Sequence, residues 1–255
     1  MRTLTAMPEN HQNPLLLCTL DLTQVCVDGP RVRLQSISEE FAAPILREFS
    51  AEITRFMLPK PTETMEQAQD FIRSSTAGMV AKREIVFAIL NNDTAEFLGC
   101  CGIHGQVDPR TPELGIWLKK SAHGQKLGRE AIALACHWAW AHIDFDYLVY
   151  PVDRANIPSR KIPESMGGVI FEQKRVKTMR GTELDEIVFK ISPEAIPKAM
   201  AAIASPRTTH CSDRCSRGAS QFCNLTPLSL NPSPRTGEGL QPGPPSPILG
   251  EGAGG

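Results

Sequence analysis

The stretch from residue 113 to residue 132 constrains the fold more than any other part of the sequence. Leu114, Ile116 and Leu118 alternate with Gly115 and Trp117, which is the period of a β-strand whose two faces have different neighbours. From residue 127 to residue 138 the apolar positions are spaced four, three and four apart, as on one face of an α-helix. Glycines at positions 124 and 128 flank the turn between them. The stretch therefore predicts a strand, a glycine-containing loop and a long helix.

The start of the predicted helix is suited to bind an anion. Its first N–H groups have no partner inside the helix, and the positive end of the helix dipole attracts a phosphate or pyrophosphate. A P-loop is excluded, because Gly128 is followed by Arg129 and Glu130 instead of Lys and a hydroxyl residue. The G-x-G-x-x-G of a dinucleotide fold is absent near the chain start. Four cationic side chains surround the loop: Lys119, Lys120, Lys126 and Arg129.

This stretch resembles motif A of the GNAT acetyltransferases, in the branch nearest the ribosomal-protein N-terminal acetyltransferases. The motif has Gln or Arg, then Gly three residues later, then Gly or Ala two residues after that, followed in this branch by Glu-Ala. Aligned on Glu130-Ala131, it covers residues 123–128. Gly128 keeps the last glycine, whereas His123 replaces the Gln or Arg and Lys126 replaces the earlier glycine. On these residues alone, an ordinary strand, turn and helix is the alternative.

The order of the predicted elements extends the resemblance over residues 29–192. We expect strands at residues 31–37, 85–90, 97–103, 114–118, 146–152, 169–176 and 184–191, and helices from about residue 38 and at 64–77, 127–142 and 159–165. This is the GNAT order of elements. It implies an α/β (α+β) fold in which a mixed, mostly antiparallel sheet of six to seven strands is splayed at strands 4 and 5 and flanked by about four helices.

The chain divides into three parts. Residues 1–28 are expected to be an irregular lead-in that can contribute one edge strand at residues 20–27. Residues 29–192 would form the acetyl-CoA-dependent acetyltransferase domain that the resemblance implies. Residues 193–255 contain ten prolines, eight glycines and a single aromatic residue, so we expect a disordered Pro/Gly/Ser-rich tail that buries no core.

Composition excludes several classes of function. A net charge of −1 over 255 residues gives no electrostatic footprint for nucleic acid or an anionic membrane. No apolar run is long enough for a membrane span, and residues 1–13 lack the basic start of a secretory signal. We therefore expect a cytoplasmic protein with no nucleic-acid or membrane partner.

The eight cysteines are expected to be reduced. Cys100 and Cys101 are adjacent in a predicted strand and Cys136 lies in a predicted helix, so they favour thiols packed as small apolar groups. A zinc-bearing interaction protein is a third hypothesis, based on a loose cluster near the C-terminus. Its spacing fits no common zinc pattern, so we expect no metal there. The cluster consists of His210, Cys211, Cys215 and Cys223.

The resemblance implies acetyl-CoA as cosubstrate. Its pantetheine arm would lie between strands 4 and 5 against the backbone of Ile116 and Leu118, and its pyrophosphate on the N–H groups from His123 to Arg129. A second match, Asn156-Ile-Pro-Ser159 followed by Gly167, suggests that Asn156 binds the pantetheine amide or anchors its loop. The expected cofactor-binding residues are Ile116, Leu118, His123, Gly124, Gln125, Lys126, Leu127, Gly128, Arg129 and Asn156.

Glu113 and Ser159 are the expected catalytic residues, also by resemblance. Glu113 would act as general base through a water molecule, or else pair with a surface lysine. Many GNAT proteins have a tyrosine acid seven residues after the Asn, but Pro163 is at that position here. Ser159 is the expected substitute, and capping the following helix is its alternative role. For His104, His123 and Tyr150 we favour surface or core roles.

The expected function is transfer of an acetyl group from acetyl-CoA to a primary amine, by direct attack in a ternary complex. The acceptor would be an amine-bearing small molecule or a polypeptide N-terminus, and the protein a monomer or homodimer. Specificity would come from residues 53–62 and the turn at Arg180-Gly181. Because Lys126 and Pro163 depart from the family pattern, the alternative is a catalytically degenerate acyl-CoA-binding or sensing module on the same fold.

Overall fold

The computed structural model of the protein describes residues 20–203, and within this range all strands belong to one sheet. They are β1 (Cys26–Asp28), β2 (Val32–Ser36), β3 (Glu84–Asn91), β4 (Phe97–His104), β5 (Glu113–Leu118), β6 (Leu148–Asp153), β7 (Val169–Lys177) and β8 (Glu183–Ile191). Their order across the sheet is β1-β2-β3-β4-β5-β6-β8-β7, and only β5 and β6 are parallel neighbours. The predicted mixed, mostly antiparallel fold is confirmed, with an 8-stranded sheet in place of six to seven strands.

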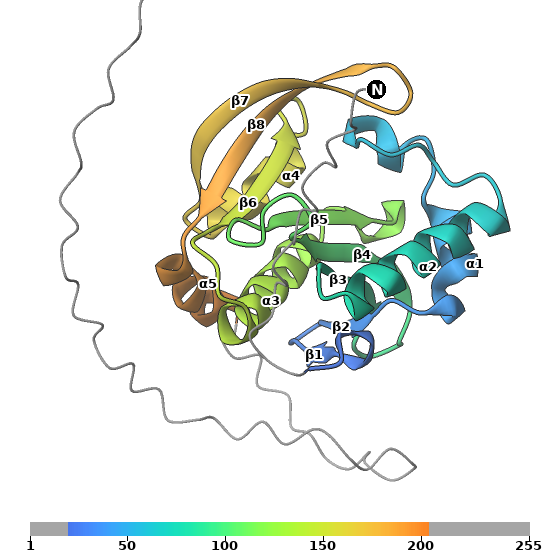
Figure 1. Ribbon diagram of the computed structural model, residues 1–255, viewed down its shortest axis with the longest axis horizontal. Helices are drawn as coiled ribbons and strands as arrows, with labels where there is room; N and C mark the ends of the chain where they lie inside the picture. Colours follow the sequence, from blue (N-terminus) through green and yellow to red (C-terminus); the bar gives the residue numbers. More distant parts are fainter. Residues whose placement is uncertain (1–19, 204–255) are drawn as a thin grey trace, which may run out of the picture. The chain divides into compact units, whose positions relative to one another are not determined.

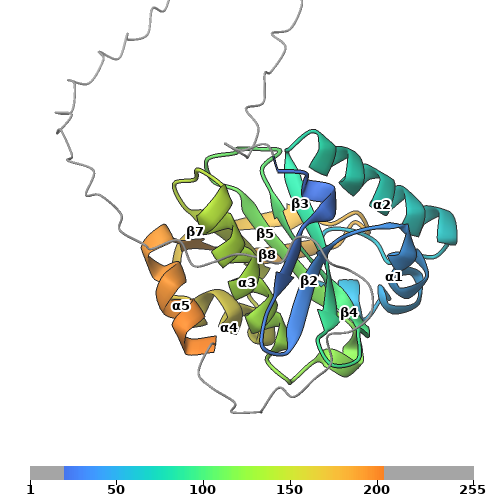
Figure 2. The same ribbon diagram turned by 90° about the horizontal axis from the view of Figure 1, so that it is seen from below.

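The helices cover both faces of the sheet (Figure 1 and Figure 2). On one face lie α1 (Ala42–Glu48) and α2 (Met65–Val80), and on the other α3 (Leu127–His142), α4 (Ile157–Ser165) and α5 (Ile196–Ile203). None of these helices is long and apolar enough to cross a membrane.

The alternation along β5 accounts for the two layers. The Trp117 ring packs on Phe49 at the end of α1, with ring centroids 4.9 Å apart. The side chains of Ile116 and Leu118 instead lie next to Gly128 in α3. Because successive side chains of a strand point to opposite faces, β5 contributes to both halves of the core, as its pattern predicts.

The helix predicted from Ser38 begins differently from the expectation. A 3-10 turn, η2 (Glu39–Phe41), comes first, and α1 follows it. Ser38 makes no capping hydrogen bond to the backbone; its hydroxyl donates to the Glu40 carboxylate at 2.8 Å. α2, in contrast, begins with a capping box between Thr64 and Gln67, which explains its well-defined start.

The folded part of the chain extends beyond residues 29–192 at both ends. β1 pairs with β2 and supplies the edge strand that the lead-in was expected to contribute. After β8, the 3-10 turn η5 (Pro193–Ala195) leads into α5, whose Ile196 is fully buried in the core. The domain therefore continues past the predicted boundary at residue 192. Residues 1–19 and 204–255, which include the cluster at 210–223, lie outside the described residues.

The cysteines of the core are packed as small apolar groups, as predicted. Cys100, Cys101 and Cys136 are buried free thiols, whereas Cys26 is exposed. Burial raises the pKa of each buried thiol, so the three side chains stay neutral.

Candidate active site

β5 and β6 meet at one point and then separate. Their register contains one pair, Glu113 with Val149, and the Val149 N–H donates to Pro112 O at 3.0 Å beside it. The other neighbouring strands of the sheet pair over several residues, β6 with β8 from Leu148 to Asp153 for example. The splay was predicted between the fourth and fifth expected strands, which are β5 and β6 in the structure. It opens from Glu113 toward the C-terminal end of β5.

The open edge of β5 presents backbone groups to this gap. Lys119 N–H donates to Leu98 O at 2.8 Å, which places the hydrogen-bonding groups of Lys119 on the β4 side. Because these groups alternate along an antiparallel strand, the N–H and C=O of Ile116 and Leu118 point away from β4 and into the gap. This is the arrangement expected of an edge that binds an extended ligand as a missing strand would bind.

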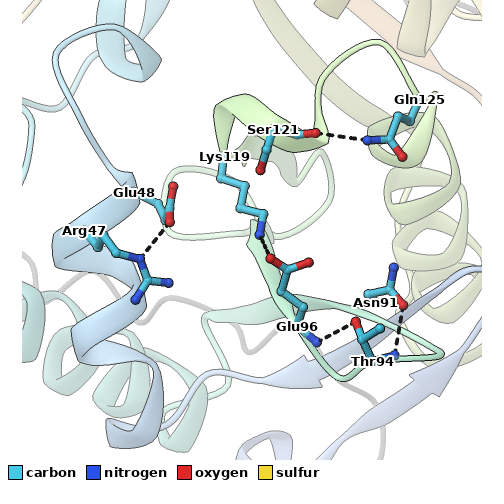
Figure 3. Close-up of polar contacts among 8 residues, drawn as sticks. All are labelled: Arg47, Glu48, Asn91, Thr94, Glu96, Lys119, Ser121 and Gln125. Carbon is cyan, nitrogen blue, oxygen red and sulfur yellow. Dashed lines mark hydrogen bonds and ion pairs between the residues drawn. The ribbon is translucent and has the colours of Figure 1, made fainter.

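The loop before α3 presents a row of backbone N–H groups. The first bond of the helix runs from Glu130 N–H to Lys126 O at 3.3 Å. The N–H groups from Gly124 to Arg129 donate to no acceptor within residues 20–203. The loop is held from within by Gln125, whose side-chain N–H donates to Ser121 O at 3.0 Å (Figure 3). With the positive end of the helix dipole, these amides can bind a diphosphate.

Lys126 shows how the loop keeps its shape without the glycine of the motif. Its φ of 63° and ψ of 13° lie in the left-handed region, which glycine adopts freely and other residues rarely do. Gly124 has a φ of 78°, so the loop contains two left-handed residues. The substitution therefore changes the backbone energy, by about 1 kcal/mol, rather than the direction of the amides.

His123 differs from the expectation. Its N–H donates to Lys120 O at 3.1 Å, which closes the 3-10 turn η4 (Lys120–Ala122), so this amide is already used. The ring Nε2 lies 2.9 Å from Leu118 O and donates to it, because a carbonyl oxygen only accepts. His123 thus fastens the loop to the end of β5, and the amides suited to an anion begin at Gly124.

Two of the four cations near the loop are paired with carboxylates. Lys119 forms an ion pair with Glu96, toward which it points in Figure 3, and Lys120 forms one with Glu52. The remaining two cations form no ion pair within the described part of the chain and are available to a phosphate: Lys126, which is exposed, and Arg129, which is half-buried.

α4 begins on the other side of the gap, where β6 ends. Asn156 is its N-cap, and its side-chain Oδ1 accepts from Ser159 N–H at 3.4 Å. Ser159 is therefore not the cap, contrary to its alternative role. Its hydroxyl lies 2.8 Å from the hydroxyl of Tyr150 in β6. Pro163, at the position of the family tyrosine, is buried inside α4.

For Tyr150 the sequence favoured a core role, and the structure adds the hydrogen bond to Ser159. Tyr150 is almost fully buried, and burial raises the pKa of its phenol, so the hydroxyl stays protonated. When this phenol donates to Ser159 Oγ, the Ser159 hydroxyl hydrogen is free to donate elsewhere.

Two carboxyl groups have a raised pKa: Glu113 at the closed end of the gap, and Glu186, which pairs with Asp153 at the opposite end of β6. Surrounding protein raises the pKa of Glu113, although part of its side chain is exposed, and His104 and Lys174 act in the opposite direction. Burial also raises the pKa of Glu186 in β8, where Lys174 lowers it and Glu113 and Asp153 raise it further. Glu186 was missed in the sequence, where its only signal is a charged residue inside an apolar strand.

A cavity of about 450 Å³ adjoins β4 and β5 on the face covered by α1 and α2. The segment and turn expected to control specificity both contribute to its wall, through Met57 and Met179. The turn is attached to the segment, because Met179 N–H donates to Leu58 O at 3.0 Å and Arg180 Nη2 to Thr54 O at 2.6 Å. Most of the lining is apolar, including Phe49, Phe71 and Trp117, and its polar residues are Lys60, Thr62, Gln67 and His104.

The structure also brings together a pair that sequence reasoning missed. His104, expected at the surface, has Nδ1 2.6 Å from Glu84 Oε2 at one end of the cavity. The two residues are 20 positions apart in sequence, and only the register of β3 on β4 makes them neighbours.

Comparison with known proteins identifies the family. The family model described as acetyltransferase (GNAT) domain matches residues 31–169. The chain belongs to the GNAT acetyltransferase family. The uncharacterized N-acetyltransferase p20 of Bacillus licheniformis is 23% identical over 168 residues, which cover 63% of this chain and 92% of p20.

Solved structures share the fold. RimJ of Mycobacterium smegmatis, in complex with CoA-disulfide, has a TM-score of 0.60 and 19% identity over 71% of this GNAT chain and 96% of RimJ. RimL, a ribosomal alpha-N-protein acetyltransferase in complex with coenzyme A, has a TM-score of 0.61 and 13% identity over 67% of this chain and 99% of RimL.

The family reaction is acetyl transfer from acetyl-CoA to an amine, and this protein is a GNAT N-acetyltransferase.

The residues at the gap fit CoA, because unpaired amides adjoin an open strand edge. Space at the helix start is limited, since a Cβ on Gly128 would lie 3.3 Å from Leu118 Cδ1 and 3.4 Å from Ile116 Cδ1. Within residues 20–203, no group of three or more His, Cys, Asp or Glu side chains is arranged to hold a metal ion.

Proposed function

We propose that this GNAT N-acetyltransferase acetylates the primary amine of an acceptor bound in the cavity beneath α1 and α2, by direct attack in a ternary complex. One observation carries the proposal: the N–H groups from Gly124 to Arg129 have no acceptor within residues 20–203 and adjoin the open edge of β5. A diphosphate on these amides would direct the rest of an extended ligand into the gap.

The cofactor-binding roles follow from this placement. The amides of residues 124–129 and the side chains of Lys126 and Arg129 bind the diphosphate, and the backbone of Ile116 and Leu118 binds the pantetheine arm. Asn156 uses its Oδ1 to cap α4, so its side-chain NH2 is the group left for a pantetheine carbonyl. When bound, acetyl-CoA supplies an acetyl group activated as a thioester.

Ser159 is the proposed general acid. Its hydroxyl lies at the start of α4, across the gap from β5, and the Tyr150 phenol can donate to its Oγ at 2.8 Å. With Tyr150 as the donor, the Ser159 proton is free to stabilise and protonate the leaving sulfur.

Glu113 is the proposed general base, acting through a water molecule. It lies at the closed end of the gap and on the same face of β5 as Gly115 and Trp117, which line the cavity. The pKa of the Glu113 carboxyl is raised, so its carboxylate is a stronger base than an ordinary one. This favours the transfer of a proton from an ammonium group.

The acceptor that the cavity favours has an apolar body and an amine at one end. Phe49, Phe71 and Met179 can bury the apolar part, while Glu113 attracts the ammonium. A polypeptide N-terminus with an apolar first side chain has this form, and the structural likeness to RimL supports this class. A small apolar amine is the second candidate.

The test is a thiol-release assay with acetyl-CoA and three classes of amine: N-terminal peptides differing in the first residue, polyamines and aminoglycosides. We expect turnover with apolar-first peptides and mass addition of one acetyl group at the α-amine. If no amine in the panel is acetylated while CoA raises the melting temperature, the chain is instead a CoA-binding or sensing module. If CoA neither binds nor supports turnover, the proposed function fails altogether.

A further inference from the structure

His104 lies between two carboxylates on neighbouring strands. In the sheet register it faces Glu84 of β3 on one side and Glu113 of β5 on the other. Its Nδ1 lies 2.6 Å from Glu84 Oε2, and the Glu84 side chain is 10% exposed. A carboxylate can only accept, so Nδ1 carries a hydrogen, and the neutral ring then has its lone pair on Nε2.

Three glycines make room for this pair. A Cβ on Gly78 in α2 would collide with Glu84 Oε1, so the absence of a side chain there admits the carboxylate. A Cβ on Gly102 would lie 2.5 Å from His104 Nε2, and one on Gly115 would lie 3.4 Å from it. The imidazole therefore lies across the two glycines of β4 and β5.

His104 Nε2 faces the acceptor cavity. His104, Gly102 and Gly115 all line it, together with Ile116 and Trp117 at the edge of the gap. No hydrogen bond joins Nε2 to a protein group within residues 20–203, and the side chain is 33% exposed. A histidine that served only to join two strands would need the Glu84 bond alone. Here the second nitrogen is left open beside the place where the amine must enter.

We infer that His104, positioned by Glu84, takes the proton from the acceptor ammonium. The inference rests on the proposed function and deepens it, because it places His104 where a water molecule would otherwise stand between Glu113 and the amine. Glu84 is then a positioning residue that fixes the tautomer. Glu113 stabilises the imidazolium from the opposite strand.

The proton balance is complete without a further reactant. Nε2 takes one proton from the ammonium, and the freed nitrogen lone pair forms the N–C bond to the acetyl carbon. The C–S bond breaks, and its electron pair leaves with sulfur. The second nitrogen proton ends on sulfur, relayed by the Ser159 hydroxyl. His104 releases its proton to solvent, so ammonium and thioester become amide, thiol and one proton.

Several titratable groups lie around this histidine. Glu84 and Glu113 flank it, and Lys174 of β7 acts on Glu113. From the cavity wall come Lys60 and the thiols of Cys100 and Cys101, which burial keeps neutral. A change in the pH profile alone could arise from Glu113 as well as from His104, so both must be varied.

Asparagine at position 104 separates the roles of the two ring nitrogens. His104→Asn keeps a donor where Nδ1 meets Glu84 but has no Nε2. We expect kcat to fall about 100-fold or more, the acidic limb of the kcat/KM profile to disappear, and the CoA-induced rise in melting temperature to stay unchanged. Glu113→Gln should slow the reaction and keep that limb. His142→Gln, at the far end of α3, is the matched control and should behave as wild type.

Nitrogen NMR provides a readout that needs no turnover. In the wild-type protein the His104 ring should be the Nδ1–H tautomer, and peptides with an apolar first residue should shift the Nε2 signal. In Glu84→Gln the ring should lose its preference for this tautomer. Wild-type kinetics in His104→Asn, or an Nε2–H tautomer insensitive to amines, would overturn the inference and leave Glu113 with water as the base. Absence of turnover in wild type would instead count against the proposed function.

Discussion

The Glu130 carboxylate binds Arg31 through both its oxygens: Oε1 accepts from the Arg31 backbone N–H at 2.6 Å, and Oε2 accepts from Nε at 2.7 Å. Oε1 also accepts from Val32 N–H at 3.1 Å. Arg31 Nη1 in turn donates to Gln125 O at 3.0 Å. This pair therefore joins the start of β2 both to α3 and to the loop before α3, which gives the glutamate of the Glu-Ala pair a structural role.

Removing Glu130 should destabilise the domain. Glu130 is 2% exposed, so Glu130→Ala leaves the buried N–H of Val32 and the half-buried N–H of Arg31 without their acceptor. The free energy of unfolding should fall by about 2–4 kcal/mol. Glu130→Gln keeps one acceptor oxygen, so its free energy of unfolding should fall by less. Urea denaturation gives both values.

The matched control is Glu164→Ala. Glu164 pairs with Arg160 across 3.8 Å, and its side chain is 46% exposed. The change should alter stability by less than about 0.5 kcal/mol, as for other exposed pairs. An equal loss in Glu130→Ala and Glu164→Ala would contradict the assigned role of Glu130.

The two left-handed residues of the loop should respond in opposite directions. Lys126→Gly removes the strain at a φ of 63° and should stabilise the protein by about 0.5–1 kcal/mol. Gly124→Ala should destabilise it by about 1 kcal/mol, through conformation alone, because a Cβ there meets nothing within 4 Å.

Lys126→Ala is the control for the lost charge. It keeps a Cβ in the left-handed region and should show no stabilisation in the same urea titrations. If Lys126→Gly were no more stable than Lys126→Ala, the strain at this position would be refuted.

Ser159→Ala should lower kcat about 100-fold with little effect on the KM for acetyl-CoA, because it removes the proposed proton donor and leaves the loop before α3 unchanged. Tyr150→Phe should give a smaller loss, since it removes only the hydrogen bond that orients Ser159. Ser165→Ala, on the same helix, where the hydroxyl donates to Ile162 O at 2.7 Å, is the control. Steady-state kinetics with an equal kcat in Ser159→Ala and Ser165→Ala would exclude Ser159 as the acid.

Glu186 should make stability depend on pH. Burial raises the pKa of its carboxyl, so the native state holds this proton more tightly than the unfolded state. The free energy of unfolding therefore falls as pH rises through the interval between the ordinary carboxyl value and the raised one. Glu186→Gln, always neutral, should lack this fall. In urea titrations at several pH values, its stability relative to wild type should therefore increase as the pH rises above the ordinary carboxyl value. Parallel curves of unfolding free energy against pH for Glu186→Gln and wild type would contradict this role of Glu186. Glu183→Gln, on the same strand, controls for the loss of an exposed carboxylate.

Local patterns sufficed for the elements that carry the fold. The alternation at residues 114–118 and the helical spacing from Leu127 gave β5 and α3 nearly to the residue. The resemblance supplied the splay, which no local pattern encodes. α5 was missed because the prolines and glycines of the whole tail outweighed Ile196 and Ala199, whose burial depends on contact with the rest of the core.

The site was less predictable, because it depends on contacts across the sheet. Glu84 and His104 are adjacent only through strand register, and Tyr150 reaches Ser159 only because α4 folds back beside β6. Lys119 has the expected charge, but it is already paired with Glu96. His123 has the expected amide, but its N–H already donates to Lys120 O. A sequence shows which groups are present near a loop and leaves open which of them are already paired.

The most direct test of the account is an amide NMR titration of the full chain with CoA, and in parallel with pantetheine, which lacks the diphosphate. We predict that CoA shifts the amide signals of residues 124–129 and that pantetheine does not, although both shift Ile116 and Leu118. If saturating CoA leaves the loop amides unchanged, the anion site before α3 does not exist, and the proposed placement of every catalytic residue falls with it.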